Sequence, residues 1–67
     1  MEFDRYYDNR NDAFGLIFTK DGNIKVYDLI WGRNGEPVHC GTIYNVSLED
    51  WDNMLDYDKN DLIISNV

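Results

Sequence analysis

The sequence predicts an α+β fold in which an antiparallel β-meander of three or four strands packs on one α-helix. Three observations support this fold class. Short runs of β-branched and aromatic residues are separated by Asp-Gly and Asn-Gly pairs, which favour hairpin turns. After residue 46 the apolar residues change from a spacing of two to the spacing of a helix. A last apolar run, residues 62–65, is expected to be a further strand.

The predicted meander consists of residues 13–19, 24–31 and 38–44. The first run is followed by Asp21-Gly22 and the second by Asn34-Gly35. Both pairs supply the positive φ angles that tight hairpin turns need. Residues 1–12 mix charged and aromatic side chains without a clean period, so we expect an irregular arm there.

A helix is predicted to begin at Ser47. Ser47 and Asp50 have the spacing of a capping box, and Val46 and Trp51 have that of a hydrophobic staple. The apolar stripe of this helix comprises Leu48, Trp51, Met54 and Leu55. The polar segment 56–61 should connect the helix to the strand at 62–65. We therefore expect one domain, 1–67, with the order β-β-β-α-β over residues 13–67.

The chain is short and acidic. It has 67 residues, thirteen of them acidic and six basic, for a formal net charge of −7. A domain of this size buries only about 60% of the surface of its unfolded chain, so dimerisation would stabilise it. Its charge repels nucleic acid and anionic membranes, and we expect neither as a direct partner. Residues 47–67 contain six acids and a single base, Lys59, so the negative field is strongest there.

The sequence also predicts a cytoplasmic location. Its single cysteine, Cys40, cannot form an intrachain disulfide, which argues against a secreted scaffold. The first residues lack the pattern of a signal peptide, and no apolar run approaches the roughly 20 residues of a membrane span. We expect a protein that is neither exported by a classical signal nor embedded in a membrane.

No residue pattern makes a convincing catalytic, cofactor or metal site. His39 and Cys40 are neighbours in a predicted strand and should point to opposite faces, which favours structural roles. Residues 56–60 imitate the first ligands of an EF-hand loop. Asp61 then stands where that loop needs Gly, and Val67 where it needs Glu. We therefore expect a non-enzymatic protein without a cofactor or metal.

The acidic C-terminal third has two interpretations. Carboxylates spaced along a helix and a turn can occupy the Lys and Arg sites that otherwise hold DNA phosphates. The same carboxylates can also be a solvated surface that only keeps a small protein soluble. Charge alone does not separate these interpretations.

The segment NVSLEDWDNML at 45–55, with the acidic turn and apolar run after it, resembles the small acidic uracil-DNA glycosylase inhibitors of Bacillus phages. The similarity covers about residues 24–66, and Ser47, Leu48, Asp50 and Trp51 carry its specific part. It implies a homodimer in the host cytoplasm that mimics DNA, with strands and a helix from each subunit. An apolar groove at the dimer interface would capture the wedge residue with which the enzyme opens the DNA stack. Trp51 stands where the family has Phe.

The sequence-based hypothesis is thus an inhibitor of uracil-DNA glycosylase. Two alternatives stay open: an acidic phage inhibitor of another nucleic-acid enzyme, such as a CRISPR nuclease, and a structural or regulatory module whose charge serves only solubility. Whether Trp51 belongs to the core or to an interface also stays open. The candidate partner-binding residues are Trp51, Leu55, Met54, Leu48, Tyr44, Glu49, Asp50, Asp52 and Asp56.

Overall fold

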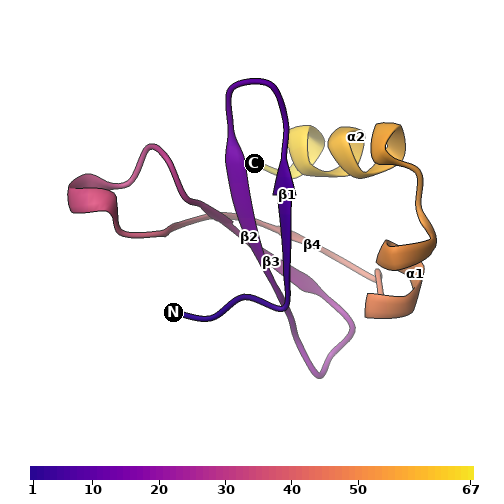
Figure 1. Ribbon diagram of the computed structural model, residues 1–67. Helices are drawn as coiled ribbons and strands as arrows, with labels where there is room; N and C mark the ends of the chain where they lie inside the picture. Colours follow the sequence, from indigo (N-terminus) through magenta and orange to yellow (C-terminus); the bar gives the residue numbers. More distant parts are fainter.

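The computed structural model describes the backbone of residues 1–67 and every side chain except that of Arg33. The fold is a four-stranded sheet with two α-helices. In Figure 1 the helices lie together at one side of the molecule and the 3-10 turn η1 lies at the opposite end. The elements in chain order are β1 (Arg5–Asp8), β2 (Ala13–Phe18), β3 (Ile24–Asp28), η1 (Arg33–Gly35), β4 (Val38–Ile43), α1 (Leu48–Asn53) and α2 (Asp56–Asn66). The predicted α+β class and antiparallel meander are confirmed.

The fourth strand lies at the N-terminus, and the prediction of an irregular arm over residues 1–12 is wrong for β1. Arg5 pairs with Leu16 and Tyr7 pairs with Phe14, so the sheet order is β1-β2-β3-β4. Tyr7 faces the core in the usual alternating pattern. Charged residues at both ends of this short edge strand hide that pattern in the sequence.

The predicted turns are present but differ in length. Thr19 N–H donates to the Asn23 carbonyl at 2.9 Å, which leaves a three-residue hairpin loop with Gly22 at φ 84°. Asn34 and Gly35 also have positive φ, at 56° and 72°, but they lie within a longer connection. The predicted strand 24–31 ends early, at Asp28, because the Asp28 carboxylate accepts hydrogen bonds from the two N–H groups of residues 30 and 31.

α1 begins as predicted and ends earlier than predicted. Asp50 N–H donates to Ser47 Oγ at 3.1 Å, and Ser47 N–H donates to Asp50 Oδ2 at 3.4 Å, so the capping box is complete. Met54 and Leu55 have extended backbone angles, with ψ near 152° for both. These two residues therefore form the link to a second helix instead of continuing the first one.

The predictions of a polar connection at 56–61 and a strand at 62–65 are wrong, because residues 56–66 form α2. Asp56 and Asp58 lie in its first turn, where they complement the positive end of the helix dipole. Ile63 is buried while Ile64 is exposed. The apolar run Leu62-Ile63-Ile64 has high strand propensity, but packing of one side of a helix decides the outcome. Neither described helix is long and apolar enough to cross a membrane.

The two helices cover one face of the sheet. α2 crosses this face, since Tyr7 Oη on β1 donates to the Asp56 carbonyl at 3.1 Å and the helix end packs on Gly41 of β4. The buried core comprises Phe14, Leu16, Ile24, Val26, Ile43, Trp51 and Ile63. On β4 the extra residue Cys40 makes a bulge, because Gly41 pairs with Val26 and His39 pairs with Tyr27.

We expect the substitution Gly41→Ala to destabilise the packing of α2. An added Cβ would overlap the carbonyl group of Asn66, so the helix end or β4 has to shift. Overpacking of this kind costs about 1–3 kcal/mol, which urea unfolding followed by circular dichroism measures. Thr42→Ala, at the next position of β4, is the matched control and should cost less. Equal stability of Gly41→Ala and the unaltered chain would contradict the close contact between α2 and β4.

Candidate functional site

The predicted partner-binding residues do not form one surface. Trp51 is 2% exposed and Met54 is half-buried, whereas Leu55 is 71% exposed. The other predicted residues on the protein surface are Tyr44, Leu48, Glu49, Asp50, Asp52 and Asp56. The early end of α1 explains this scatter, because Met54 and Leu55 no longer continue the stripe that starts at Leu48.

Trp51 is a core residue. Its ring meets the ring of Tyr7 edge to face, with centroids 6.2 Å apart. Lys59 Nζ lies 5.5 Å from the centroid of the Trp51 ring, a cation–π arrangement. In the single chain the indole is therefore closed off by β1 and α2. The described residues contain no pocket and no group of three or more metal-ligating side chains.

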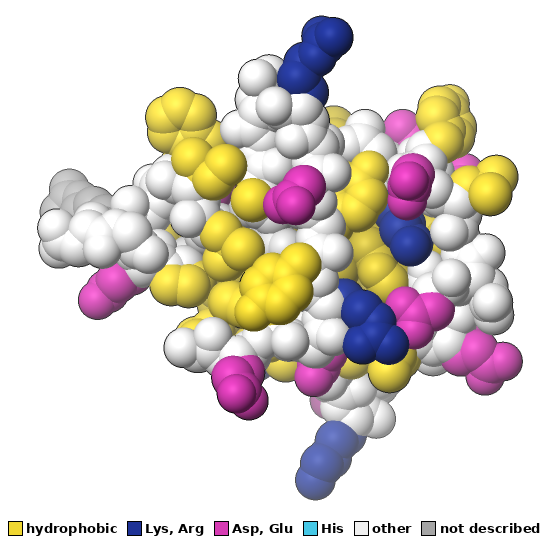
Figure 2. Space-filling view, viewed as in Figure 1, with side chains coloured by type: hydrophobic (Ala, Val, Ile, Leu, Met, Phe, Trp, Pro, Cys, Tyr) yellow, Lys and Arg dark blue, Asp and Glu magenta, His cyan; other side chains and the backbone are white. Residues whose placement is uncertain are grey.

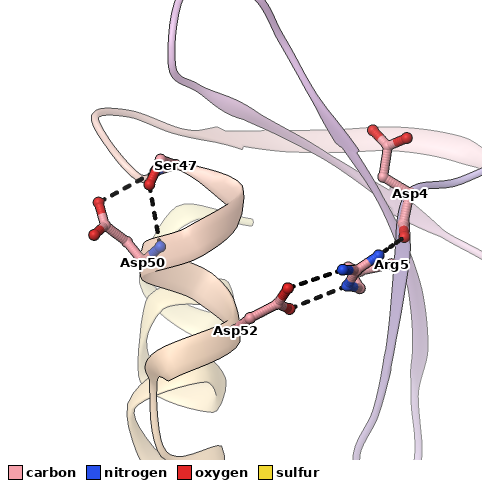
Figure 3. A network of polar contacts seen from close by, with 5 residues as sticks. All are labelled: Asp4, Arg5, Ser47, Asp50 and Asp52. Carbon is pink, nitrogen blue, oxygen red and sulfur yellow. Dashed lines mark hydrogen bonds and ion pairs between the residues drawn. The ribbon is translucent and has the colours of Figure 1, made fainter.

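Two of the predicted acids are engaged within the chain, as Figure 3 shows. Asp50 closes the capping box with Ser47. Asp52 accepts two hydrogen bonds from the Arg5 guanidinium, at 3.0 Å from Nε and 2.8 Å from Nη2. This pairing lowers the pKa of Asp52, chiefly through the hydrogen bonds, and raises the pKa of Arg5. The Arg5–Asp52 pair thus ties β1 to α1, which leaves Asp52 less suited to a partner.

His39 and Cys40 point to opposite sides of the sheet, as their adjacency on a strand predicted. The Cys40 thiol donates to the Val26 carbonyl at 3.4 Å and packs against the core. Burial raises the pKa of this thiol, which keeps it protonated. His39 lies on the other face, against the Tyr27 ring and 3.3 Å from Thr42 Oγ1.

The outer side of α2 carries a surface that the sequence interpretation missed. Tyr57 is 74% exposed and Ile64 is 54% exposed, although both are large and apolar. Asp58 and Asp61 are also exposed. These four residues occupy positions i, i+1, i+4 and i+7, which lie on one side of a helix. We call Tyr57, Asp58, Asp61 and Ile64 the docking face.

The helical spacing within residues 56–66 is the signal that could have found the docking face. It was obscured because α2 has no side-chain cap at Leu55 and because its apolar residues are mainly consecutive. A segment with acids in its first turn and exposed apolar residues at i and i+7 fits a helix that binds a partner.

The docking face combines features of a charged protein interface. Exposed aromatic and aliphatic side chains serve as anchors when a partner buries them. Carboxylates beside such anchors attract basic groups and speed association. In the view of Figure 2, acidic side chains are spread over much of the surface, and apolar side chains gather at the centre and left of the view as well as at its upper right. The arrangement on α2 is suited to a partner whose binding surface is basic.

Comparison of the chain with protein-family models, with curated proteins and with solved structures found no match.

The Arg5–Asp52 pair should make stability depend on pH in a defined range. Because the pKa of Asp52 is lowered in the folded chain, the stabilisation is complete above the ordinary value of 3.8. It declines as the pH falls below that value and is lost once the lowered pKa is passed. We expect the stability difference between the unaltered chain and Asp52→Asn to shrink in this way, measured by urea unfolding at several pH values. A difference that does not change with pH would argue against the ion pair.

Trp51→Ala should unfold or strongly destabilise the protein. Removal of a buried Trp side chain costs about 3–5 kcal/mol, a large share of the stability of a small domain. Leu55→Ala, which removes an exposed side chain from a nearby position, should cost less than about 0.5 kcal/mol. Circular dichroism and urea unfolding compare the two variants. A Trp51→Ala protein with normal stability would show that the indole is not part of the core.

Proposed function

We propose that this protein is an inhibitor that occupies the basic DNA-binding groove of a nucleic-acid enzyme, with uracil-DNA glycosylase as its target. The observation that carries the proposal is the docking face of α2. There, two exposed carboxylates stand beside two exposed apolar side chains on a helix held firmly against the sheet. A groove that binds DNA presents the complementary chemistry, with Lys and Arg side chains around the sites for phosphates.

Charge supports competition with DNA. The chain has a formal net charge of −7, and Asp56, Asp58 and Asp61 are all exposed on α2. A negative field of this strength steers the protein towards a basic groove and repels DNA itself. Inhibition should therefore become weaker as salt is added, because salt screens the attraction between exposed charges.

The target comes from the resemblance at residues 45–55, with changed roles for its residues. Ser47 and Asp50 act in the cap of α1, and Trp51 acts in the core. The contacts that the resemblance assigned to Trp51 are transferred in this proposal to Leu55, Tyr57 and Ile64, which are exposed. These side chains are available to contact the apolar wedge of the enzyme, which is uncovered when DNA is absent.

The proposal also places the protein in the cytoplasm of a bacterial host, where enzymes that repair host DNA act. A reducing compartment suits its single, half-buried thiol.

The direct test is uracil excision from a labelled duplex, titrated with the protein at low and at moderate salt. We expect stoichiometric inhibition that excess DNA relieves and that added salt weakens. Tyr57→Ala should weaken inhibition by about fivefold or more, because truncating an interface anchor costs more than about 1 kcal/mol. Unchanged excision at a large molar excess of the protein would exclude this target.

Two double variants that each remove two charges distinguish an effect of the docking face from an effect of the net charge of the chain. Asp58→Asn combined with Asp61→Asn removes two charges from the docking face. Glu2→Gln combined with Asp21→Asn removes two charges from exposed positions elsewhere. We expect the first pair to lower the association rate and its salt dependence, measured by stopped-flow binding, and the second pair to have a smaller effect. Equal effects of the two pairs would leave only non-specific charge as an explanation.

A further inference from the structure

The face of the sheet opposite the helices is unusually apolar. An antiparallel sheet that turns one face to water normally alternates apolar residues inside with polar residues outside. Here aromatic rings lie on both faces. We call the uncovered side the open sheet face; its residues are Tyr6, Asp8, Ala13, Gly15, Ile17, Lys25, Tyr27, His39 and Thr42, as the strand register places them.

A row of aromatic rings crosses the open sheet face from β1 to β4. Phe3 folds back onto this face, with ring centroids 5.7 Å from Tyr6 and 5.4 Å from Tyr27. Tyr27 in turn lies 5.3 Å from the His39 ring. Gly15 makes room for this row, because a Cβ there would overlap the Phe3 ring. Tyr6 remains 62% exposed and His39 is also exposed, so the row is open to a partner.

The charges of the open sheet face favour a second copy of this chain as that partner. Among its strand positions only Asp8 and Lys25 are charged, and their signs are opposite. The six acids of residues 47–67 lie on or beside the helices, which cover the other face. Two chains that each carry a net charge of −7 can therefore approach on this side with little repulsion, whereas a basic partner is drawn to the helices.

The edges of the sheet are less suited to a second copy. β1 has only four residues and carries Arg5 and Asp8 at its ends, and β4 is bulged at Cys40. Short length, edge charges and bulges all hinder the addition of another strand. α1 is also poorly suited to contact a second copy, because the Trp51 side chain is buried within its own subunit.

We propose that two copies of the chain pack through their open sheet faces, with the aromatic rows of Tyr6, Phe3 and Tyr27 in contact. The two sheets form the centre of the dimer at the usual separation of about 10 Å, and the helices form its outer layers. Each docking face then points away from the dimer interface. One dimer presents two docking faces, and self-association and partner binding use separate surfaces.

Sedimentation equilibrium over a wide range of protein concentration tests the proposal. We expect a mass twice the chain mass of 7.9 kDa at high concentration. Tyr6→Glu places a like charge on both copies at the interface and should weaken the dimer by roughly 100-fold. Lys25→Glu, at an exposed position, should act in the same direction even if Tyr6→Glu affects folding. Circular dichroism checks the fold of each variant.

Tyr57→Glu is the matched control, because it introduces the same charge at a similarly exposed Tyr on the docking face. We expect it to leave the dimer intact and to reduce binding to a basic partner, whereas Tyr6→Glu should do the reverse. The proposal is overturned if the unaltered chain stays monomeric at the highest concentration. It is also overturned if Tyr57→Glu dissociates the dimer as strongly as Tyr6→Glu and Lys25→Glu. Since this readout is mass and not enzyme inhibition, either proposal can fail without the other.

Discussion

Burial of the Trp51 indole between the sheet and the helices is the constraint on which the rest of the structure depends. α1 has only six residues, and helices this short are not stable in water without tertiary contacts. Trp51 provides such contacts, with Tyr7 from β1 on one side and Lys59 from α2 on another. The N-terminal strand, the first helix and the second helix therefore meet at one side chain. This meeting point fixes the direction of α2 and hence the side of the helix that faces solvent.

The sequence predicted those parts of the fold that depend on local chemistry. The hairpin glycines, the capping box at Ser47 and the central strands follow from residues that are neighbours in the chain. β1 and α2 were not predictable in this way, because each depends on a distant element. β1 needs its pairing with β2, and α2 needs the close approach over Gly41. The candidate site was the least predictable part, because Tyr57 and Ile64 share a surface only if residues 56–66 are helical.

The distribution of charge and aromatic residues gives the two faces of the molecule different properties. Acids gather on the helical side, while the opposite side has aromatic rings and few charges. A surface rich in one sign resists contact with copies of itself and attracts the opposite sign. A surface with few charges does not repel a copy of itself, and burial of its apolar groups favours contact. Both proposed interactions follow from this separation, and each uses the face whose chemistry fits it.

The bulge at Cys40 has a consequence for how far the protein can assemble. A regular, exposed edge strand can accept another strand, whose own free edge then accepts the next, so growth has no natural end. The bulge interrupts β4 at the position where such a strand would dock, and the charged ends of β1 discourage docking at the other edge. Contact through a sheet face, by comparison, is complete once two copies have met. The bulge thus favours a closed particle over a fibre.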